Sequence, residues 1–242
     1  MKNRRISLPG LDLTGSFSFE SQILLVAGGR QPKPEWLQEA ARGRFLWGAD
    51  RGCSAFLKAG LLPHGGTGDF DSLAKSDLEK LKRAEVPLYF HPSDKDETDL
   101  ELALKDALNH AGDNSAVWLS GGWGGRFDHL TGCMRTMEVL GKSALGLADE
   151  KEVLLFLRDQ EEIQVEFSLT PLAISLIPLS EKVTGIELSG VHWPLSGAEW
   201  RWAQPPPISN RLAEDSKRMT LRIAQGLIGL YFCFEEPKME NE

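Results

Sequence analysis

The fold of this 242-residue chain is decided by the stretch ILLVAGG at residues 23–29. Five consecutive apolar residues that end in two glycines are typical of a strand buried on both faces and followed by a tight turn. Strands of this kind belong to parallel sheets covered by helices on each side. The stretch therefore predicts an α/β fold.

The pattern of a short apolar strand followed by a helix repeats as far as about residue 149. Further strands are expected at 45–47, 86–90 and 117–119, and helices at 34–41, around 56–57, and at 76–84, 98–110 and 128–140. The helix at 98–110 is the best defined, because its apolar residues recur at helical spacing. Thr98 and Glu101 predict a capping box at its start, and Ser76 and Glu79 predict another at the helix of 76–84.

From about residue 150 the sequence becomes rich in short strands. These are expected at 153–157, 163–167, 172–177, 183–188, 219–223 and 227–234, with proline and glycine turns between them. This succession of short strands and turns predicts a β-sandwich. The predicted organisation is a poorly ordered lead-in at 1–21, an α/β domain at 22–149, a β-sandwich domain at 150–234 and an acidic tail at 235–242.

Composition restricts the classes of function. The formal net charge of -8 argues against a nucleic-acid partner, because duplex binding requires a basic surface. No apolar run reaches the roughly 20 residues of a membrane span, and the N-terminus lacks the apolar run of a secretory signal. Three cysteines without CxxC spacing argue against a disulfide framework or a zinc site, so a cytoplasmic location is expected.

Aspartates gather where the predicted strands end, which is the edge at which open α/β sheets bind ligands. They are Asp50, the pair in GDFDS at 68–72 (Asp69 and Asp71), three in DKDETD at 94–99 (Asp94, Asp96 and Asp99), and Asp128 after GGRF at 124–127. Like charges at one edge repel each other, so a cation is expected there. Mg²⁺, which binds carboxylates together with substrate phosphates, is the natural candidate.

Each aspartate taken singly also has a structural interpretation, as a helix-opening charge or a solvated turn residue. Glycine clusters at 28–29, 65–68 and 121–125 lie beside these acids and indicate close backbone approach to phosphates. The sequence has no GxxxxGK[ST], so a P-loop kinase is excluded.

Four of these motifs, ADRG at 49–52, GDFDS at 68–72, DKDETD at 94–99 and GGRFDH at 124–129, together resemble the thiamine pyrophosphokinase family in order and spacing. SLIPL at 175–179, GVHWPL at 190–195 and ISN at 208–210 are similar to the C-terminal segments of that family. The resemblance extends over about residues 22–234.

The resemblance implies a largely parallel, Rossmann-like nucleotide- and metal-binding domain at 22–149 and a thiamine-binding β-sandwich at 150–234. It also implies Mg²⁺-dependent transfer of pyrophosphate from ATP to thiamine with release of AMP, and a homodimer with the thiamine pocket between subunits. Pterin pyrophosphokinases of the same superfamily share GDxDS, so a hydroxymethylpterin acceptor is one alternative. A non-catalytic thiamine or nucleotide sensor is another.

Site residues are carried over by their match to the motifs. Those implied to hold Mg²⁺ and the pyrophosphate are Asp69, Asp71, Asp96 and Asp99, with Asp69, Asp71 and Asp99 assigned to the metal and Asp96 to receiving the hydroxyl proton. Arg126 is assigned to phosphate charge, and the nucleotide-binding set is Asp50, Arg51, Lys95, Thr98 and Asp128. Lys95 and Arg51 depart from the glutamine and glycine of many relatives, which leaves their roles open.

For the acceptor, the resemblance implies that Trp193 stacks on the thiamine ring and that Ser209 and Asn210 supply hydrogen bonds. A cationic ring against an indole face is a sound pairing. Core or dimer interface is the structural alternative for Trp193.

Overall fold

The computed structural model describes residues 3–92, 96–112 and 114–235. By the contacts among its residues the chain divides into two units. One is formed by residues 19–149, and the other by the residues up to Ser18 together with those from Glu150 onward. In the described ranges, no helix is both long enough and apolar enough to cross a membrane. The predicted acidic tail, from residue 236 on, lies outside the described residues.

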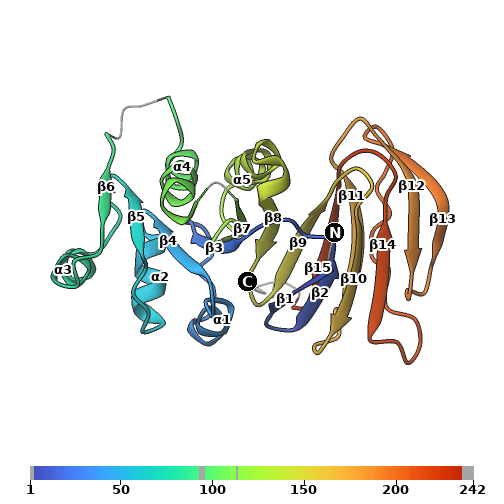
Figure 1. The fold of residues 1–242 in the computed structure, drawn as a ribbon, viewed down its shortest axis with the longest axis horizontal. Coiled ribbons are helices and arrows are strands. Elements are labelled where there is room, and N and C mark those ends of the chain that lie inside the picture. Colours follow the sequence, from blue (N-terminus) through green and yellow to red (C-terminus); the bar gives the residue numbers. More distant parts are fainter. Residues whose placement is uncertain (1–2, 93–95, 113, 236–242) are drawn as a thin grey trace, which may run out of the picture. The chain divides into compact units, whose positions relative to one another are not determined.

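A six-stranded parallel sheet forms the centre of the unit of residues 19–149, in the order β8-β7-β3-β4-β5-β6. Its strands are β3 (Ser21–Val26), β4 (Phe45–Ala49), β5 (Gly65–Gly68), β6 (Leu88–Phe90), β7 (Ser115–Ser120) and β8 (Ala144–Ala148). The connections hold helices α1 (Pro34–Ala40), α2 (Gly52–Lys58), α3 (Lys75–Arg83), α4 (Asp99–Ala111) and α5 (Phe127–Val139), and a short 3-10 turn at Gly141–Ser143. The predicted α/β fold is confirmed, with α4 and α5 on one side of the sheet and α1 and α2 on the other (Figure 1).

The strand order places a switch point beside β3. The chain runs from β3 outward through β4, β5 and β6, and then returns to form β7 and β8 on the other side of β3. The loops that follow β3 and β7 therefore leave the carboxyl edge of the sheet in opposite directions, which is the arrangement at which open α/β sheets bind ligands. Asp50, which follows β4, and Asp69 and Asp71, which follow β5, lie at this edge.

Strand β5 was not predicted, because its sequence Gly-Gly-Thr-Gly has the composition of a loop. The structure explains the glycines by the neighbouring side chains. A Cβ on Gly65 would lie 2.4 Å from the indole of Trp47, and one on Gly66 would lie 2.6 Å from the Sγ of Cys53. The strand is thus built around bulky neighbours, which local propensity does not register.

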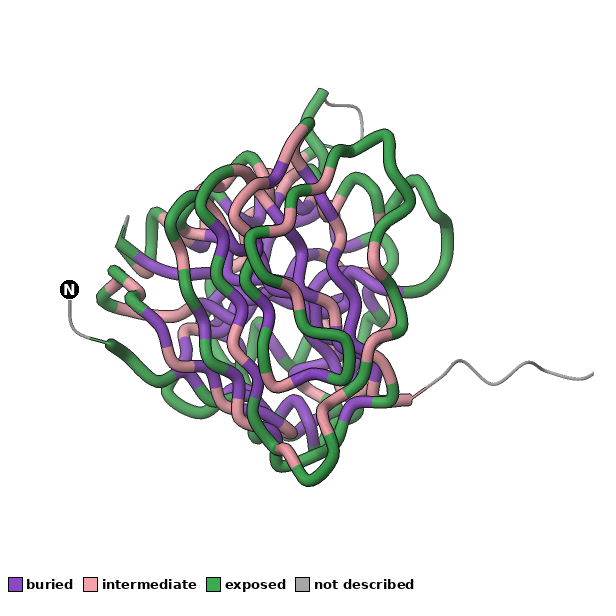
Figure 2. The backbone as a smooth tube through the Cα atoms, turned by 90° about the vertical axis from the view of Figure 1, so that its right-hand side faces the viewer, coloured by how far each residue is buried: buried purple, intermediate pink, exposed green. Residues whose placement is uncertain are grey.

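The β-rich unit packs antiparallel strands in two layers. Six strands pair in the order β1-β2-β10-β14-β12-β13, and β15 lies between β11 and β9. The bounds are β1 (Arg4–Leu8), β2 (Leu11–Gly15), β9 (Glu152–Leu157), β10 (Glu162–Phe167), β11 (Ala173–Pro178), β12 (Lys182–Ser189), β13 (Leu195–Arg201), β14 (Arg218–Arg222) and β15 (Ile228–Cys233). Phe167 of β10 meets Phe232 of β15 edge to face, with ring centroids 5.0 Å apart, so side chains of both layers form one core. Figure 2 shows the buried stretches along the strands and the exposed ones in the connections.

The expectation of a poorly ordered segment at 1–21 is wrong. Residues 4–15 form the β1–β2 hairpin, turned at Gly10, which has a φ of 95°, and β2 pairs with β10. Ile6, Leu11 and Leu13 are each 1% exposed. Alternate residues of this short hairpin supply the buried face, and the strand that β2 pairs with comes about 150 residues later in the chain. The N-terminal residues therefore belong to the β-rich unit.

The two predicted capping boxes have different outcomes. Helix α4 begins with the predicted box: the Thr98 hydroxyl accepts from the backbone N–H of Glu101, and the Glu101 carboxylate accepts from the backbone N–H of Thr98. The box predicted from Ser76 and Glu79 is wrong. Helix α3 begins at Lys75, its N-cap is Ala74, and no side chain caps it.

Candidate active site

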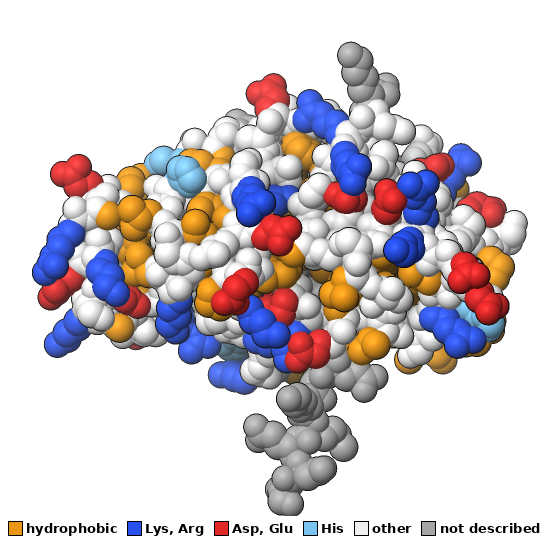
Figure 3. Space-filling model, turned by 90° about the horizontal axis from the view of Figure 1, so that it is seen from below, with side chains coloured by type: hydrophobic (Ala, Val, Ile, Leu, Met, Phe, Trp, Pro, Cys, Tyr) orange, Lys and Arg blue, Asp and Glu red, His pale blue; other side chains and the backbone are white. Residues whose placement is uncertain are grey.

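Three carboxylates meet at the carboxyl edge of the parallel sheet. Asp50 directly follows β4, and Asp69 and Asp71 directly follow β5, the neighbouring strand. One carboxylate oxygen from each lies within 4.8 Å of the others. Because adjacent parallel strands end at the same edge, residues about 20 positions apart in sequence become neighbours in space. On the face drawn in Figure 3 acidic and basic side chains are interspersed.

The loop from 68 to 72 holds its two acids in place through the residue between them. Phe70 is 4% exposed, packs with Leu73 and Leu81, and meets Phe90 edge to face at 4.9 Å. The backbone N–H of Asp71 donates to Oδ1 of Asp69 over 3.1 Å. With the aromatic ring buried between them, both carboxylates are left at the surface.

Backbone strain accompanies this arrangement. Asp50 and Phe70 have φ values of 50° and 58°, in the left-handed region that non-glycine residues rarely adopt. A Cβ on Gly68 would lie 3.1 Å from Asp50, so only glycine lets the two loops approach so closely. Strained positions that persist in a fold concentrate at functional sites, which favours a functional role for this edge.

The negative charges of the three carboxylates favour the binding of a cation. The negative charge of Asp69 raises the pKa of the Asp71 carboxyl above its ordinary value. Oδ2 of Asp50 accepts a hydrogen bond from the Ser72 hydroxyl, whereas Oδ1 is buried without a hydrogen-bond partner among the described residues. A hard divalent cation fits this donor set, since it takes oxygen ligands and would satisfy the orphaned oxygen.

The remaining acids of the predicted site lie at the start of α4. Asp96 is exposed in the preceding loop, and Asp99 is the first residue of the helix. Among the described residues the group of close carboxylates contains Asp50 and neither Asp96 nor Asp99. The Thr98 side chain is engaged in the capping box, and Lys95 lies outside the described residues. The roles assigned to these four residues stay predictions.

Two of the three predicted cationic residues are described, and they lie on loops at the same edge. The Arg51 guanidinium donates to the carbonyl oxygens of Gly28 and Gly29 and so fastens the loop after β3 to the start of α2. Arg126, the N-cap of α5, forms an exposed ion pair with Asp128, which lowers the pKa of the Asp128 carboxyl. An exposed pair of this kind is weak, so Arg126 can exchange Asp128 for a phosphate at little cost.

The structure adds two polar groups that the sequence did not single out. Oγ of Ser120, the last residue of β7, and Oε1 of Gln31, in the loop after β3, are buried without hydrogen-bond partners among the described residues. Ser120 is 0% exposed. Ser120 ends β7 and Gln31 follows β3, the two strands at the switch point. A ligand bound there would supply the missing hydrogen-bond partners. A lone serine or glutamine carries no sequence signal of this kind.

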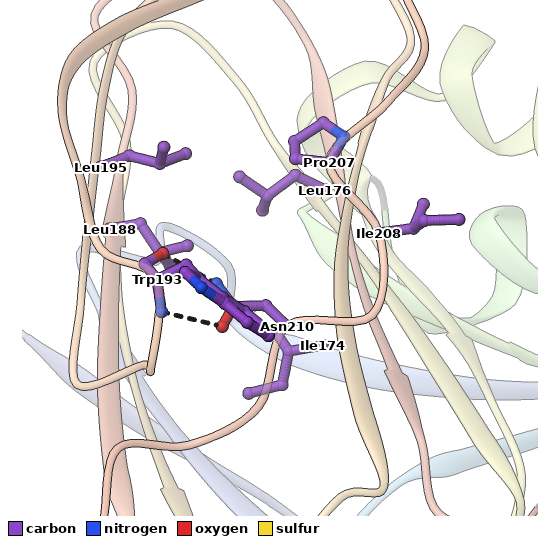
Figure 4. A pocket seen from close by; sticks show the side chains of 8 residues that line it. All are labelled: Ile174, Leu176, Leu188, Trp193, Leu195, Pro207, Ile208 and Asn210. Carbon is purple, nitrogen blue, oxygen red and sulfur yellow. Dashed lines mark hydrogen bonds between the residues drawn. The ribbon is translucent and has the colours of Figure 1, made fainter.

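An apolar pocket of about 180 Å³ lies in the β-rich unit. Its lining residues are Ile174, Leu176, Leu188, Trp193, Leu195, Pro207, Ile208 and Asn210. In Figure 4 Leu188 and Leu195 stand on one side of the pocket, and Leu176 and Pro207 on the other. Two of the three predicted acceptor-binding residues, Trp193 and Asn210, therefore line one cavity.

Trp193 and Asn210 are fixed to each other. The backbone N–H of Trp193 donates to Oδ1 of Asn210 over 3.2 Å, and Nδ2 of Asn210 donates to the Trp193 carbonyl over 2.8 Å. The Arg211 guanidinium lies 5.9 Å from the indole centroid. The Asn210 amide thus holds the backbone of Trp193 at both its N–H and its carbonyl. By fixing this backbone, Asn210 orients the indole.

Ser209 lies beside the pocket without lining it. Its φ is 60°, and its backbone N–H donates to the Ser175 hydroxyl over 3.1 Å. This contact, with the hydrogen bond from Leu176 N–H to the Pro207 carbonyl, holds residues 207–210 against β11. The assigned hydrogen bond from Ser209 to the acceptor stays a prediction.

Comparison with known proteins bears on both parts of the chain. Residues 37–146 match the family model described as thiamin pyrophosphokinase, catalytic domain, and residues 160–228 match thiamin pyrophosphokinase, vitamin B1 binding domain. The chain is 30% identical over 208 residues to a thiamine pyrophosphokinase of Bacillus subtilis, which covers 85% of this chain and 95% of the relative.

Solved structures agree with these matches. The crystal structure of thiamine pyrophosphokinase from Bacillus subtilis superimposes with a TM-score of 0.77 at 27% identity and covers 89% of this chain and 100% of that one. That of thiamin pyrophosphokinase from Geobacillus thermodenitrificans gives 0.75 at 28% identity, with coverages of 89% and 98%.

Proposed function

The chain belongs to the thiamine pyrophosphokinase family, and we propose that it transfers a pyrophosphoryl group from ATP to the hydroxyl of thiamine. The observation that carries the proposal is the meeting of Asp50, Asp69 and Asp71 at the carboxyl edge, inside the stretch that matches the catalytic-domain model. Three adjacent carboxylates repel each other and add nothing to the stability of a surface. Polyphosphate chemistry needs a cation at the phosphates, and these carboxylates could bind it.

The proposed metal is Mg²⁺, and Asp50, Asp69 and Asp71 would hold it. When bound, it would neutralise the charge of the phosphate oxygens. Oδ1 of Asp50, buried without a hydrogen-bond partner in the part of the chain that the structure describes, supports this assignment. Asp99, assigned to the metal from the sequence, and Asp96 stand at the entrance to α4, from which they would act on the pyrophosphate or on the acceptor.

The proposed reaction is an in-line displacement. The thiamine hydroxyl oxygen forms a bond to the β-phosphorus of ATP, the bond from that phosphorus to the α-β bridging oxygen breaks, and AMP leaves with the electron pair. The hydroxyl proton passes to a carboxylate, for which Asp96 is the proposed acceptor. Arg126, after exchanging Asp128 for phosphate, would spread the charge that develops on the phosphate oxygens, together with Lys95.

The proposed acceptor site is the apolar pocket of the β-rich unit. Its lining suits the ring of thiamine, and Trp193, which is 57% exposed, would stack on that ring. The vitamin B1 binding-domain model covers residues 160–228, which include the whole lining.

A homodimer in the cytoplasm is the proposed setting. Large apolar side chains of the β-rich unit, Leu172, Trp193, Trp202 and Ile208, are each more than half exposed. Such exposure favours a contact with another protein surface. Cys53, Cys133 and Cys233 are free thiols, which suits a reducing compartment.

The test is an assay of AMP release by the purified protein. We expect AMP and thiamine pyrophosphate when ATP, thiamine and Mg²⁺ are all present, and neither product when thiamine is omitted or Mg²⁺ is chelated. AMP release with a hydroxymethylpterin and not with thiamine would replace the acceptor. Tight binding of thiamine without AMP release would mean a sensor and end the proposal of catalysis.

A further inference from the structure

An ion pair outside the acidic group crosses the carboxyl edge of the parallel sheet. Nε and Nη2 of Arg30 donate to Oδ2 of Asp149 over 2.9 and 2.7 Å. The Asp149 side chain is 0% exposed and that of Arg30 is 26% exposed. A buried carboxylate is costly unless a cation and hydrogen bonds offset the loss of water, so this contact is built into the fold rather than a chance surface pair.

The two partners reach each other across an intervening strand. Arg30 lies in the loop after β3, and Asp149 directly follows β8, while β7 lies between those two strands. Two strand spacings amount to about 10 Å, a distance that the long side chain of arginine helps to span. The pair therefore passes over the end of β7, where the glycine-rich loop at 121–125 begins.

The backbone of the same residues holds that loop. The N–H of Arg30 donates to the Trp123 carbonyl over 2.5 Å, and the N–H of Gly29 donates to the Gly121 carbonyl over 2.7 Å. Gly124 has a φ of 77°, and a Cβ on it would lie 3.0 Å from the Cβ of Arg30. The loop thus lies directly against Arg30.

We propose that the Arg30–Asp149 ion pair is a strap that holds the 121–125 loop in the conformation that binds the phosphates of the nucleotide, and that Arg30 is a positioning residue. The inference rests on the proposed function, since it takes ATP as the ligand of this edge. Arg30 fixes the loop through its backbone and side chain together, so the loop is shaped before the nucleotide arrives. Preorganisation of this kind removes the cost of ordering the loop on binding.

The experiment compares three variants: Arg30→Met, Asp149→Leu and the two combined. The readouts are the melting temperature and the Kd of ATP, measured calorimetrically with Mg²⁺ and without thiamine. Each single change removes one member of the ion pair and should lower the melting temperature, because the buried Asp149 carboxylate loses this cation in Arg30→Met and the partly exposed Arg30 loses this carboxylate in Asp149→Leu. The double variant removes both charges and should recover it, because buried ion pairs are often replaceable by apolar residues.

The Kd of ATP separates positioning from folding. We expect it to rise roughly 10-fold in Arg30→Met and to stay raised in the double variant, whose loop is folded but no longer strapped. The KM for thiamine should not change. A double variant that melts and binds ATP like the original protein would overturn the inference.

Arg44→Met is the matched control. Arg44 is a buried arginine of this unit, 9% exposed, but it precedes β4 at the opposite edge and donates to the Ala40 carbonyl and to Gln22. It should lower the melting temperature without changing the Kd of ATP. An equal rise of the Kd in this variant would show general loosening and overturn the strap. If the original protein binds ATP but releases no AMP with thiamine, the proposed function fails while the strap is still decided by the Kd.

Discussion

The acidic edge of the parallel sheet and the apolar pocket of the β-rich unit differ in charge and in how their polar atoms are hydrogen-bonded. The edge gathers three carboxylates on strained loops, and one of their oxygens is buried without a hydrogen-bond partner within the described ranges. The pocket is lined by six aliphatic or proline side chains, an indole and one amide, and that amide is already satisfied. The proposed Mg²⁺ would complete the first region, whereas the residues that line the second carry no charge. The difference teaches that each half supplies a separate chemistry, charge in one and ring recognition in the other.

Removing one charge from the acidic edge is expected to give the largest effect. Asp71→Asn should lower kcat about 100-fold to 1,000-fold, because the proposed Mg²⁺ would lose a ligand. The charge that develops on the phosphate oxygens in the transition state would then be less well stabilised. The KM for thiamine should stay nearly unchanged, as the pocket is untouched. Rates of AMP release at varied Mg²⁺ measure this.

Glu79→Gln is the control for that substitution, since it removes the same charge from an exposed helix position of the same unit. It should leave kcat unaltered. A comparable loss in both variants would mean that net charge rather than the acidic group controls the rate, and the contrast between the regions would collapse.

Removing the indole of the pocket should give an intermediate effect of the opposite kind. Trp193→Ala is expected to raise the KM for thiamine about 10-fold, or ~1.4 kcal/mol of stacking, with the dependence on Mg²⁺ preserved. Steady-state kinetics with thiamine varied measure it. Leu169→Ala, which truncates another exposed apolar side chain of that unit that does not line the pocket, should leave the KM unaltered. A fall in kcat alone would contradict the division of roles.

The smallest expected effect concerns Thr98, whose assigned role in nucleotide binding competes with its role as a helix cap. Thr98→Ala should lower the free energy of unfolding by ~1 kcal/mol, because α4 loses the side-chain acceptor of its capping box. Urea denaturation measures this. If the cap is its whole role, the KM for ATP stays the same. A raised KM with unchanged stability would assign Thr98 to the acidic edge instead.

The sequence predicted those parts of the fold that have a local signature. The apolar stretch at 23–29 gave strand β3, and the Thr98–Glu101 pattern gave the start of α4, because hydrophobic period and capping depend on near neighbours. It missed β5, whose glycines make room for Trp47 and Cys53, and the β1–β2 hairpin, which pairs with β10, a strand about 150 residues later in the chain. Both depend on residues distant in sequence.

The candidate site shows the same division between features set by near neighbours in the sequence and features set by distant residues. The sequence by itself determined the kinds of group present, acids after parallel strands and a tryptophan among short β-strands, because strand ends and motif order are written along the chain. Only the tertiary structure decided that Asp50 and not Asp99 completes the close group with Asp69 and Asp71, that Asn210 holds Trp193, and that Arg30 reaches Asp149 across β7. The physical reason is that strand order and loop conformation set which side chains meet, and these follow from the packing of the whole sheet.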